Sequence, residues 1–124
     1  MKDLAGRMKM KYSEAMAQAD ILRSNTCDDK QKALWIYELD CDIANIHGVD
    51  KPEFVWPDID AELIEESPHD NIYPLYLAAK IDYYNQETSL YSNDMAIFNA
   101  AYNDARAEWR RNHRLECKNY WKVM

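Results

Sequence analysis

Residues 88–114, TSLYSNDMAIFNAAYNDARAEWRRNHR, carry the most regular pattern in this sequence. Apolar and aromatic side chains recur there at alternating spacings of four and three residues: Tyr91, Met95, Phe98, Tyr102, Ala105 and Trp109. This spacing predicts an α-helix that begins near Thr88 or Ser89 and has all six side chains on one face. Such a helix is about 40 Å long. We therefore expect its last turns to extend beyond a small domain or to contact a partner.

A second helix is predicted from residue 29 to residue 47. Its apolar face repeats at helical spacing and contains Trp35, Leu39, Ile43 and Ile46. Asp28 and Gln31 have the spacing of a capping box at the start, and Gly48 is a favoured residue directly after a helix. One face of this helix is expected to be core and the other to face water.

Two shorter helices complete the set. The first is expected at 14–23, with Ser13 as its N-cap. The third is expected at 71–85, with Asp70 as its N-cap and Pro74 in the first turn, where no helical hydrogen bond is lost. The third helix has apolar residues on two faces, which predicts contacts on both. One face contains Ile72, Leu75, Tyr76, Ala79 and Tyr83, and the other contains Tyr73, Leu77, Ile81 and Tyr84.

The segment 49–70 differs from its surroundings because three prolines interrupt any helix. We expect an extended loop or a hairpin-like excursion with short strands at 53–56 and 62–65. Its apolar residues, among them Phe54 and Trp56, need cover. The chain's own helices and a neighbouring subunit are both open as the source of that cover.

The fold class predicted is mainly α: a bundle of about four helices with a long C-terminal helix. One domain at 1–114 and a tail at 115–124 are expected, and the two glycines in the chain argue against a β-rich fold. No apolar run is long enough for a membrane span, and the basic start lacks the apolar stretch of a signal peptide. A protein made in the cytoplasm, with no membrane partner, is the expectation.

Charge is unevenly distributed along the chain. Residues 1–105 contain 9 Lys/Arg and 20 Asp/Glu, whereas residues 106–124 contain 6 and 2. An acidic body repels DNA phosphates, which argues against sequence-specific DNA binding. The basic end and the aromatic residues of the tail, which include Tyr120 and Trp121, are typical of an anchor for a protein partner.

No catalytic or metal-binding motif is present. His47, His69 and His113 have no helical spacing to one another, and Cys27, Cys41 and Cys117 form no CxxC or Cys/His cluster. The acids Asp40 and Asp42 flank Cys41 but cannot converge on one helix. The alternating acids Asp58, Asp60 and Glu62 lack the glycine and terminal glutamate of a calcium loop. We expect a non-enzymatic protein without cofactor or metal.

Several blocks of the sequence resemble head–tail connector (adaptor) proteins of tailed bacteriophages and prophages. They are DDKQKALWIYELD at 28–40, ESPHDNIY at 66–73, LAAKIDYYN at 77–85 and YSNDMAIFNAAY at 91–102. The specificity of the resemblance lies in the order of these blocks between residues 28 and 114. The final ten residues and the N-terminus fall outside it.

This resemblance implies a virion structural protein at the head–tail junction that assembles as a ring, usually of about twelve copies. Such a ring docks on the portal protein, receives a tail-completion or stopper protein, and lets double-stranded DNA pass through its lumen. We expect the subunit interface to contain Tyr73, Leu77, Ile81, Tyr84, Phe54 and Trp56. We expect the portal contact to contain Arg110, Arg111, Arg114, Tyr120, Trp121 and Lys122. The alternative is a small acidic regulator that mimics DNA and inhibits a nucleic-acid enzyme, motivated by 13 acids between residues 28 and 70.

Overall fold

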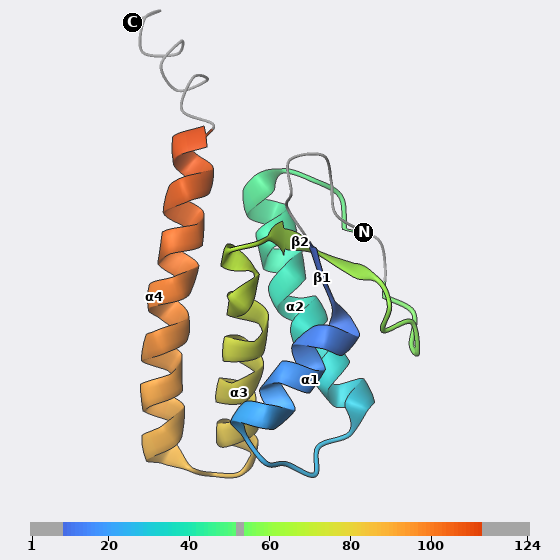
Figure 1. Cartoon of the computed structure of the whole chain (residues 1–124), viewed down its shortest axis with the longest axis vertical. Helices are drawn as coiled ribbons and strands as arrows, with labels where there is room; N and C mark the ends of the chain where they lie inside the picture. Colours follow the sequence, from blue (N-terminus) through green and yellow to red (C-terminus); the bar gives the residue numbers. More distant parts are fainter. Residues whose placement is uncertain (1–8, 52–53, 113–124) are drawn as a thin grey trace, which may run out of the picture.

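The computed structural model describes residues 9–51 and 54–112 and is mainly α-helical, as the sequence predicts (Figure 1). The four α-helices are α1 (Tyr12–Leu22), α2 (Asp29–His47), α3 (Ile72–Tyr84) and α4 (Thr88–Asn112). The strands are β1 (Lys9–Lys11) and β2 (Glu62–Glu66), and a 3₁₀ turn, η1 (His69–Asn71), precedes α3. No helix within the described residues is apolar over a length sufficient to cross a membrane.

Helix α3 occupies the centre of the bundle. It packs against α4 on one side and α2 on the other, and α1 crosses it on a third side. Helices α3 and α4 lie side by side and antiparallel, joined by a short turn at one end of the molecule (Figure 1). The core contains the fully buried side chains of Tyr12, Ile36, Ile43, Leu63, Ile72, Tyr73, Leu77 and Ile81.

The two strands form a small antiparallel sheet in which Lys9 lies opposite Glu66 and Lys11 opposite Glu62. The strand predicted at 62–65 is therefore present as β2. Its partner β1 precedes α1, and residues 54–56 are not in a strand. Both cross-strand pairs place a Lys opposite a Glu, and opposite charges at such positions favour the pairing.

The start of α1 differs from the prediction that Ser13 is the N-cap. The helix begins at Tyr12, and Lys11 is its N-cap, with the Lys11 N–H donating a 2.9 Å hydrogen bond to the Glu14 carboxylate. Tyr12 and Ser13 donate their backbone N–H groups to the carbonyls of Ala61 and Ile59, at 3.2 and 2.9 Å. The loop before β2 thus satisfies the first N–H groups of the helix, which removes the need for a side-chain cap.

Helix α2 begins and ends where the sequence indicates, but its first cap differs. The Asp28 side chain makes no capping hydrogen bond, so the predicted capping box with Gln31 is wrong. Gly48 follows the helix with φ 70°, in the left-handed region, as predicted. Val49 then donates its N–H to the Ala44 carbonyl at 3.0 Å, which closes the helix end.

Helix α3 begins at Ile72, after η1. Asp70 lies within that 3₁₀ turn, and the N-cap position is held by Asn71 in helical conformation, so Asp70 is not the cap that the sequence predicted. Pro74 falls in the first turn of α3, as expected. The inward face of α4 contains Phe98 and Ala105, both buried, in agreement with the predicted apolar stripe.

Candidate interaction surface

Three of the residues expected at a subunit interface are core residues instead. Tyr73, Leu77 and Ile81 each have 0% of their surface exposed within the single chain. Helix α1 packs on α3 and, together with α2 and α4, covers the second apolar face of α3. A neighbouring subunit cannot reach these side chains in this structure, so the expectation for them is corrected.

Phe54 is half-buried by the chain's own aromatic residues. Its ring stacks on Tyr12, with centroids 4.9 Å apart, and lies 6.0 Å from the ring of Tyr37. The chain itself therefore supplies much of the cover that the sequence left open for this residue. Val55 and Trp56, which follow, remain 65% and 37% exposed.

Tyr84 is the one member of the predicted α3 interface set that stays on the surface. It is 60% exposed, and its neighbour Tyr83 is 68% exposed. The Tyr84 ring meets the Trp35 ring of α2 edge to face, with centroids 6.4 Å apart. Tyr83 contacts Tyr91 of α4 at 5.5 Å. The end of α3 thus presents aromatic side chains toward both flanking helices.

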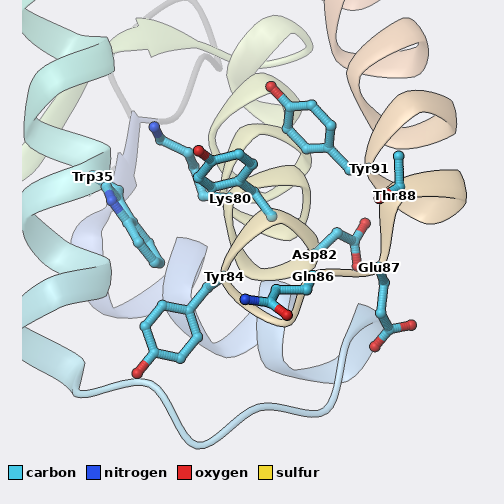
Figure 2. Close-up of a pocket in the computed structure, with 9 residues that line it drawn as sticks. Trp35, Lys80, Asp82, Tyr84, Gln86, Glu87, Thr88 and Tyr91 are labelled. Carbon is cyan, nitrogen blue, oxygen red and sulfur yellow. The ribbon is translucent and has the colours of Figure 1, made fainter.

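These side chains line an open groove of about 670 Å³, here called the aromatic groove (Figure 2). Figure 2 shows Trp35 on one wall, Tyr91 on the opposite wall, and Tyr84, Gln86 and Glu87 near the α3–α4 turn. The full lining is Trp35, Lys80, Asp82, Tyr83, Tyr84, Gln86, Glu87, Thr88 and Tyr91. Its position opposite α1 makes it the remaining open side of α3.

Acidic residues continue from this groove along α2. Burial raises the pKa of the Tyr76 hydroxyl, and the nearby carboxylates of Glu38 and Asp42 raise it further. Both acids are exposed. Lys80 places its ammonium 5.6 Å from the centroid of the Tyr76 ring. The open side of α3 therefore combines aromatic rings with carboxylates.

A buried ionic cluster fixes the floor of the groove at its α3–α4 end. Arg23, directly after α1, donates Nε–H to Asp82 Oδ1 at 3.1 Å and pairs with Asp94 through Nη2 at 2.7 Å. Burial raises the pKa of Asp82 above its ordinary value, and the adjacent Asp94 raises it further despite the opposing effect of Arg23. One guanidinium thus joins the ends of α1, α3 and α4.

The far end of α4 carries the exposed basic residues Arg110 and Arg111. Arg111 lies 3.7 Å from Glu108, one turn earlier on the same helix, and remains largely exposed. The other residues expected at the portal contact, Arg114, Tyr120, Trp121 and Lys122, lie outside the described residues. The sequence predicts that the last turns of α4 extend beyond the domain or contact a partner. The structure describes this helix as far as Asn112.

Below this basic end, α4 packs on the end of α2. The Trp109 ring stacks on the His47 imidazole, with centroids 4.8 Å apart and planes 5° from parallel. His47 also lies 3.7 Å from Glu65, and His69 lies 3.3 Å from Glu108. These residues border a cavity of about 260 Å³ between β2 and α4. Burial raises the pKa of Glu65 to about 6, although His69 lowers it.

Over residues 9–51 and 54–112, no group of three or more His, Cys, Asp or Glu side chains is placed to hold a metal ion. Cys27 and Cys41 are free thiols, both partly buried.

Sequence reasoning missed the aromatic groove as a unit. Trp35 was assigned to the core face of α2, and Tyr83 and Tyr84 to different faces of α3. A signal was present in the adjacent tyrosines at the end of a helix, followed within three residues by Gln86 and Glu87. Adjacent side chains point in directions about 100° apart on a helix, so a tyrosine pair in the last turn directs two rings to different sides.

Comparisons with known proteins return no match: no family model, no curated protein and no solved structure is significantly similar to this chain.

Proposed function

We propose that this protein is a virion structural subunit, a head–tail connector that assembles into a ring and docks on a portal protein. The observation that carries the proposal is the aromatic groove beside a bundle whose core is already closed. Trp35, Tyr83, Tyr84 and Tyr91 are amphipathic aromatic residues of the kind enriched where proteins bind one another. A subunit that is complete as a fold but leaves such a surface open is suited to assembly.

The charge distribution supports the same proposal. Exposed acids lie along α2, and exposed arginines lie at the end of α4. A wall of carboxylates offers phosphates no attractive contact, which suits a conduit through which DNA slides. The basic end of α4 is complementary to an acidic protein surface, and the proposal requires the portal to provide one. The ordered sequence blocks that resemble connector proteins are the second support.

The alternative function, inhibition by DNA mimicry, has less support. A mimic needs its acids exposed in a phosphate-like array. Asp40 is fully buried, and Glu65, Glu66 and Asp70 are only partly exposed. Several of the 13 acids that motivated the alternative are therefore engaged within the fold.

The test is electron microscopy of the full chain mixed with the portal oligomer encoded in the same genome. A connector adds a ring of density to one face of the portal. The double variant Arg110→Glu, Arg111→Glu should lose at least tenfold in portal affinity, because it reverses the exposed charge at the end of α4. Lys30→Glu, a charge reversal at an exposed site on α2, is the matched control and should bind as the wild type does. Absence of portal density with the wild-type chain at saturating concentration would refute the function.

A further inference from the structure

The chemistry of the aromatic groove specifies the kind of segment that it can hold. Its walls are the rings of Trp35, Tyr84 and Tyr91, and Glu87 lies exposed at its open end. The lining cation, Lys80, has its ammonium near the Tyr76 ring. Aromatic faces attract both aromatic side chains and cations, and a carboxylate at the rim attracts a cation. The groove therefore fits a segment that combines aromatic rings with lysine or arginine.

The chain contains one such segment outside the described residues. Residues 118–122, KNYWK, place Tyr120 and Trp121 between Lys118 and Lys122. Over residues 113–124 there are three Lys/Arg and one Glu, whereas the described body is strongly acidic. This segment therefore matches the groove in aromatic character, and its lysines are complementary to the exposed carboxylate of Glu87.

We propose that residues 118–122 of one copy bind in the aromatic groove of a second copy, with Tyr120 and Trp121 against the rings and Lys122 beside Glu87. In the proposed ring this contact joins neighbouring subunits. The inference therefore rests on the part of the proposed function that concerns ring assembly. It gives Tyr120, Trp121 and Lys122 a role between subunits in place of the portal contact expected from the sequence. Arg110 and Arg111 remain available for the portal.

The length of α4 favours the tail of a second copy over the chain's own tail as the occupant. Helix α4 has 25 residues, which at the rise of an α-helix separates its two ends by about 37 Å. The groove is lined by Thr88 and Tyr91 at the start of this helix, and residues 113–124 follow its other end in the sequence. The nine residues from Asn112 to Trp121 span about 31 Å when fully extended. Trp121 of the same chain could therefore approach the groove only if residues 113–121 were almost fully extended, whereas the tail of a second copy is under no such constraint.

The contact joins two different surfaces, the tail of one copy and the groove of the next. Such a heterologous contact leaves one tail and one groove free in every pair, so it propagates until a ring closes. A copy with a defective tail and a copy with a defective groove can still form one contact between them. This property provides a test that a general loss of folding cannot imitate.

The test is sedimentation velocity on full-length chains at concentrations up to the millimolar range. The tail variant is Tyr120→Ala, Trp121→Ala, and the groove variant is Tyr84→Ala, Glu87→Lys. Each variant alone should sediment as a monomer of 14.7 kDa, whereas the wild type forms larger species. An equimolar mixture of the two should form a heterodimer and nothing larger, because the remaining tail and groove are both defective.

Charge reversal at Glu87, in the lining of the groove, provides a second experiment. Glu87→Lys alone should weaken association at least tenfold, and Glu87→Lys combined with Lys122→Glu should restore it. Asp104→Lys, an equal change at an exposed site on α4 outside the groove, should associate as the wild type does, as should Ile21→Ala on α1. A monomeric wild type, a groove variant with wild-type association, or a mixture that forms no heterodimer overturns the proposal. Portal binding in the earlier experiment is measured separately, so failure of one proposal is distinguishable from failure of the other.

Discussion

The hydroxyl of Tyr73 in α3 donates a 2.7 Å hydrogen bond to the carboxylate of Asp40 in α2, and both side chains are fully buried. Asp40 also accepts the Ile64 N–H at 3.2 Å and pairs with the Lys51 ammonium. The same Tyr73 oxygen accepts the Glu65 N–H at 2.9 Å. One buried pair thus holds β2, and Lys51 at the start of the preceding loop, against two helices. The same contacts explain how a charged residue is accommodated at the centre of the bundle.

Replacement of Tyr73 by phenylalanine should destabilise the fold by about 1–3 kcal/mol. The variant keeps the ring but leaves the Glu65 N–H without its acceptor and Asp40 without one donor, and unsatisfied buried polar groups are costly. Urea denaturation followed by circular dichroism measures the change in the free energy of unfolding. Tyr84→Phe, the same change at an exposed tyrosine of α3, should stay within about 0.5 kcal/mol of the wild type. Equal effects of the two variants would contradict this assignment.

Leu77→Ala should cost about 2–5 kcal/mol in the free energy of unfolding, because the side chain is fully enclosed by the single chain. The loss should be independent of protein concentration. If Leu77 belonged to a subunit interface instead, its replacement would alter association while the monomer kept its stability. Denaturation at two protein concentrations a hundredfold apart separates these cases.

The helices were predictable from the sequence because their signals are local. The alternating four-and-three spacing from Tyr91 to Trp109 requires only that one face of a helix meet a core, and α4 does so. Gly48 marks the end of α2 for an equally local reason, since few residues tolerate its backbone conformation. The strand at Glu62–Glu66 was also predicted from its composition.

Features that depend on distant residues were missed. The second face of α3 was assigned to a neighbouring subunit because nothing local indicates that α1 covers it. The partner of β2 lies more than fifty residues earlier in the chain, at Lys9–Lys11, and no turn signal connects the two. Arg23 and Asp82 are equally far apart, yet they form the ionic cluster beneath the aromatic groove. A local pattern cannot specify any of these pairs.

Gly48→Ala should reduce stability by about 1 kcal/mol, although nothing lies within 4 Å of the added methyl group. The cost arises because φ at this position is +70°, where side chains other than glycine are strained. Gly48→Asn should cost less, since asparagine tolerates this conformation better. Thermal unfolding at fixed pH measures both variants. An alanine variant as stable as the wild type would show that this helix end rearranges without cost.

Glu65→Gln should stabilise the protein above pH 7 and have little effect near pH 4. The folded-state pKa of Glu65, about 6, lies above its ordinary value of 4.5. The folded state therefore binds this proton more tightly, and the resulting stabilisation is present below pH 4.5 and lost as the pH rises through 6. Glutamine imitates the neutral acid at every pH. The expected gain at pH 8 is about 1 kcal/mol after allowance for partial exposure.

The titratable neighbours of Glu65 include His47, His69 and Glu108, so the measurement requires a reference. The wild type and Glu65→Gln are therefore both denatured at half-unit steps from pH 4 to pH 8. The difference between their free energies of unfolding cancels whatever the neighbours contribute equally to both proteins. Asp104→Asn, at an exposed carboxylate on α4, is the control and should show no gain in stability above pH 7. A difference between Glu65→Gln and the wild type that does not change with pH would contradict the assignment.

Arg23→Met should be among the most destabilising single changes, at about 3–5 kcal/mol near pH 7, because Asp82 and Asp94 would remain buried together without their shared cation. The cost should fall as the pH decreases, since protonation of one carboxyl relieves the repulsion between them. Adding Asp82→Asn to Arg23→Met should recover part of the loss at pH 7 and little at pH 4. Chemical denaturation of the three proteins at both pH values measures the effect. If the double variant were as unstable as Arg23→Met at pH 7, repulsion between the two carboxylates would not be the cause, and the packing of the Arg23 side chain between α1, α3 and α4 would account for the loss instead.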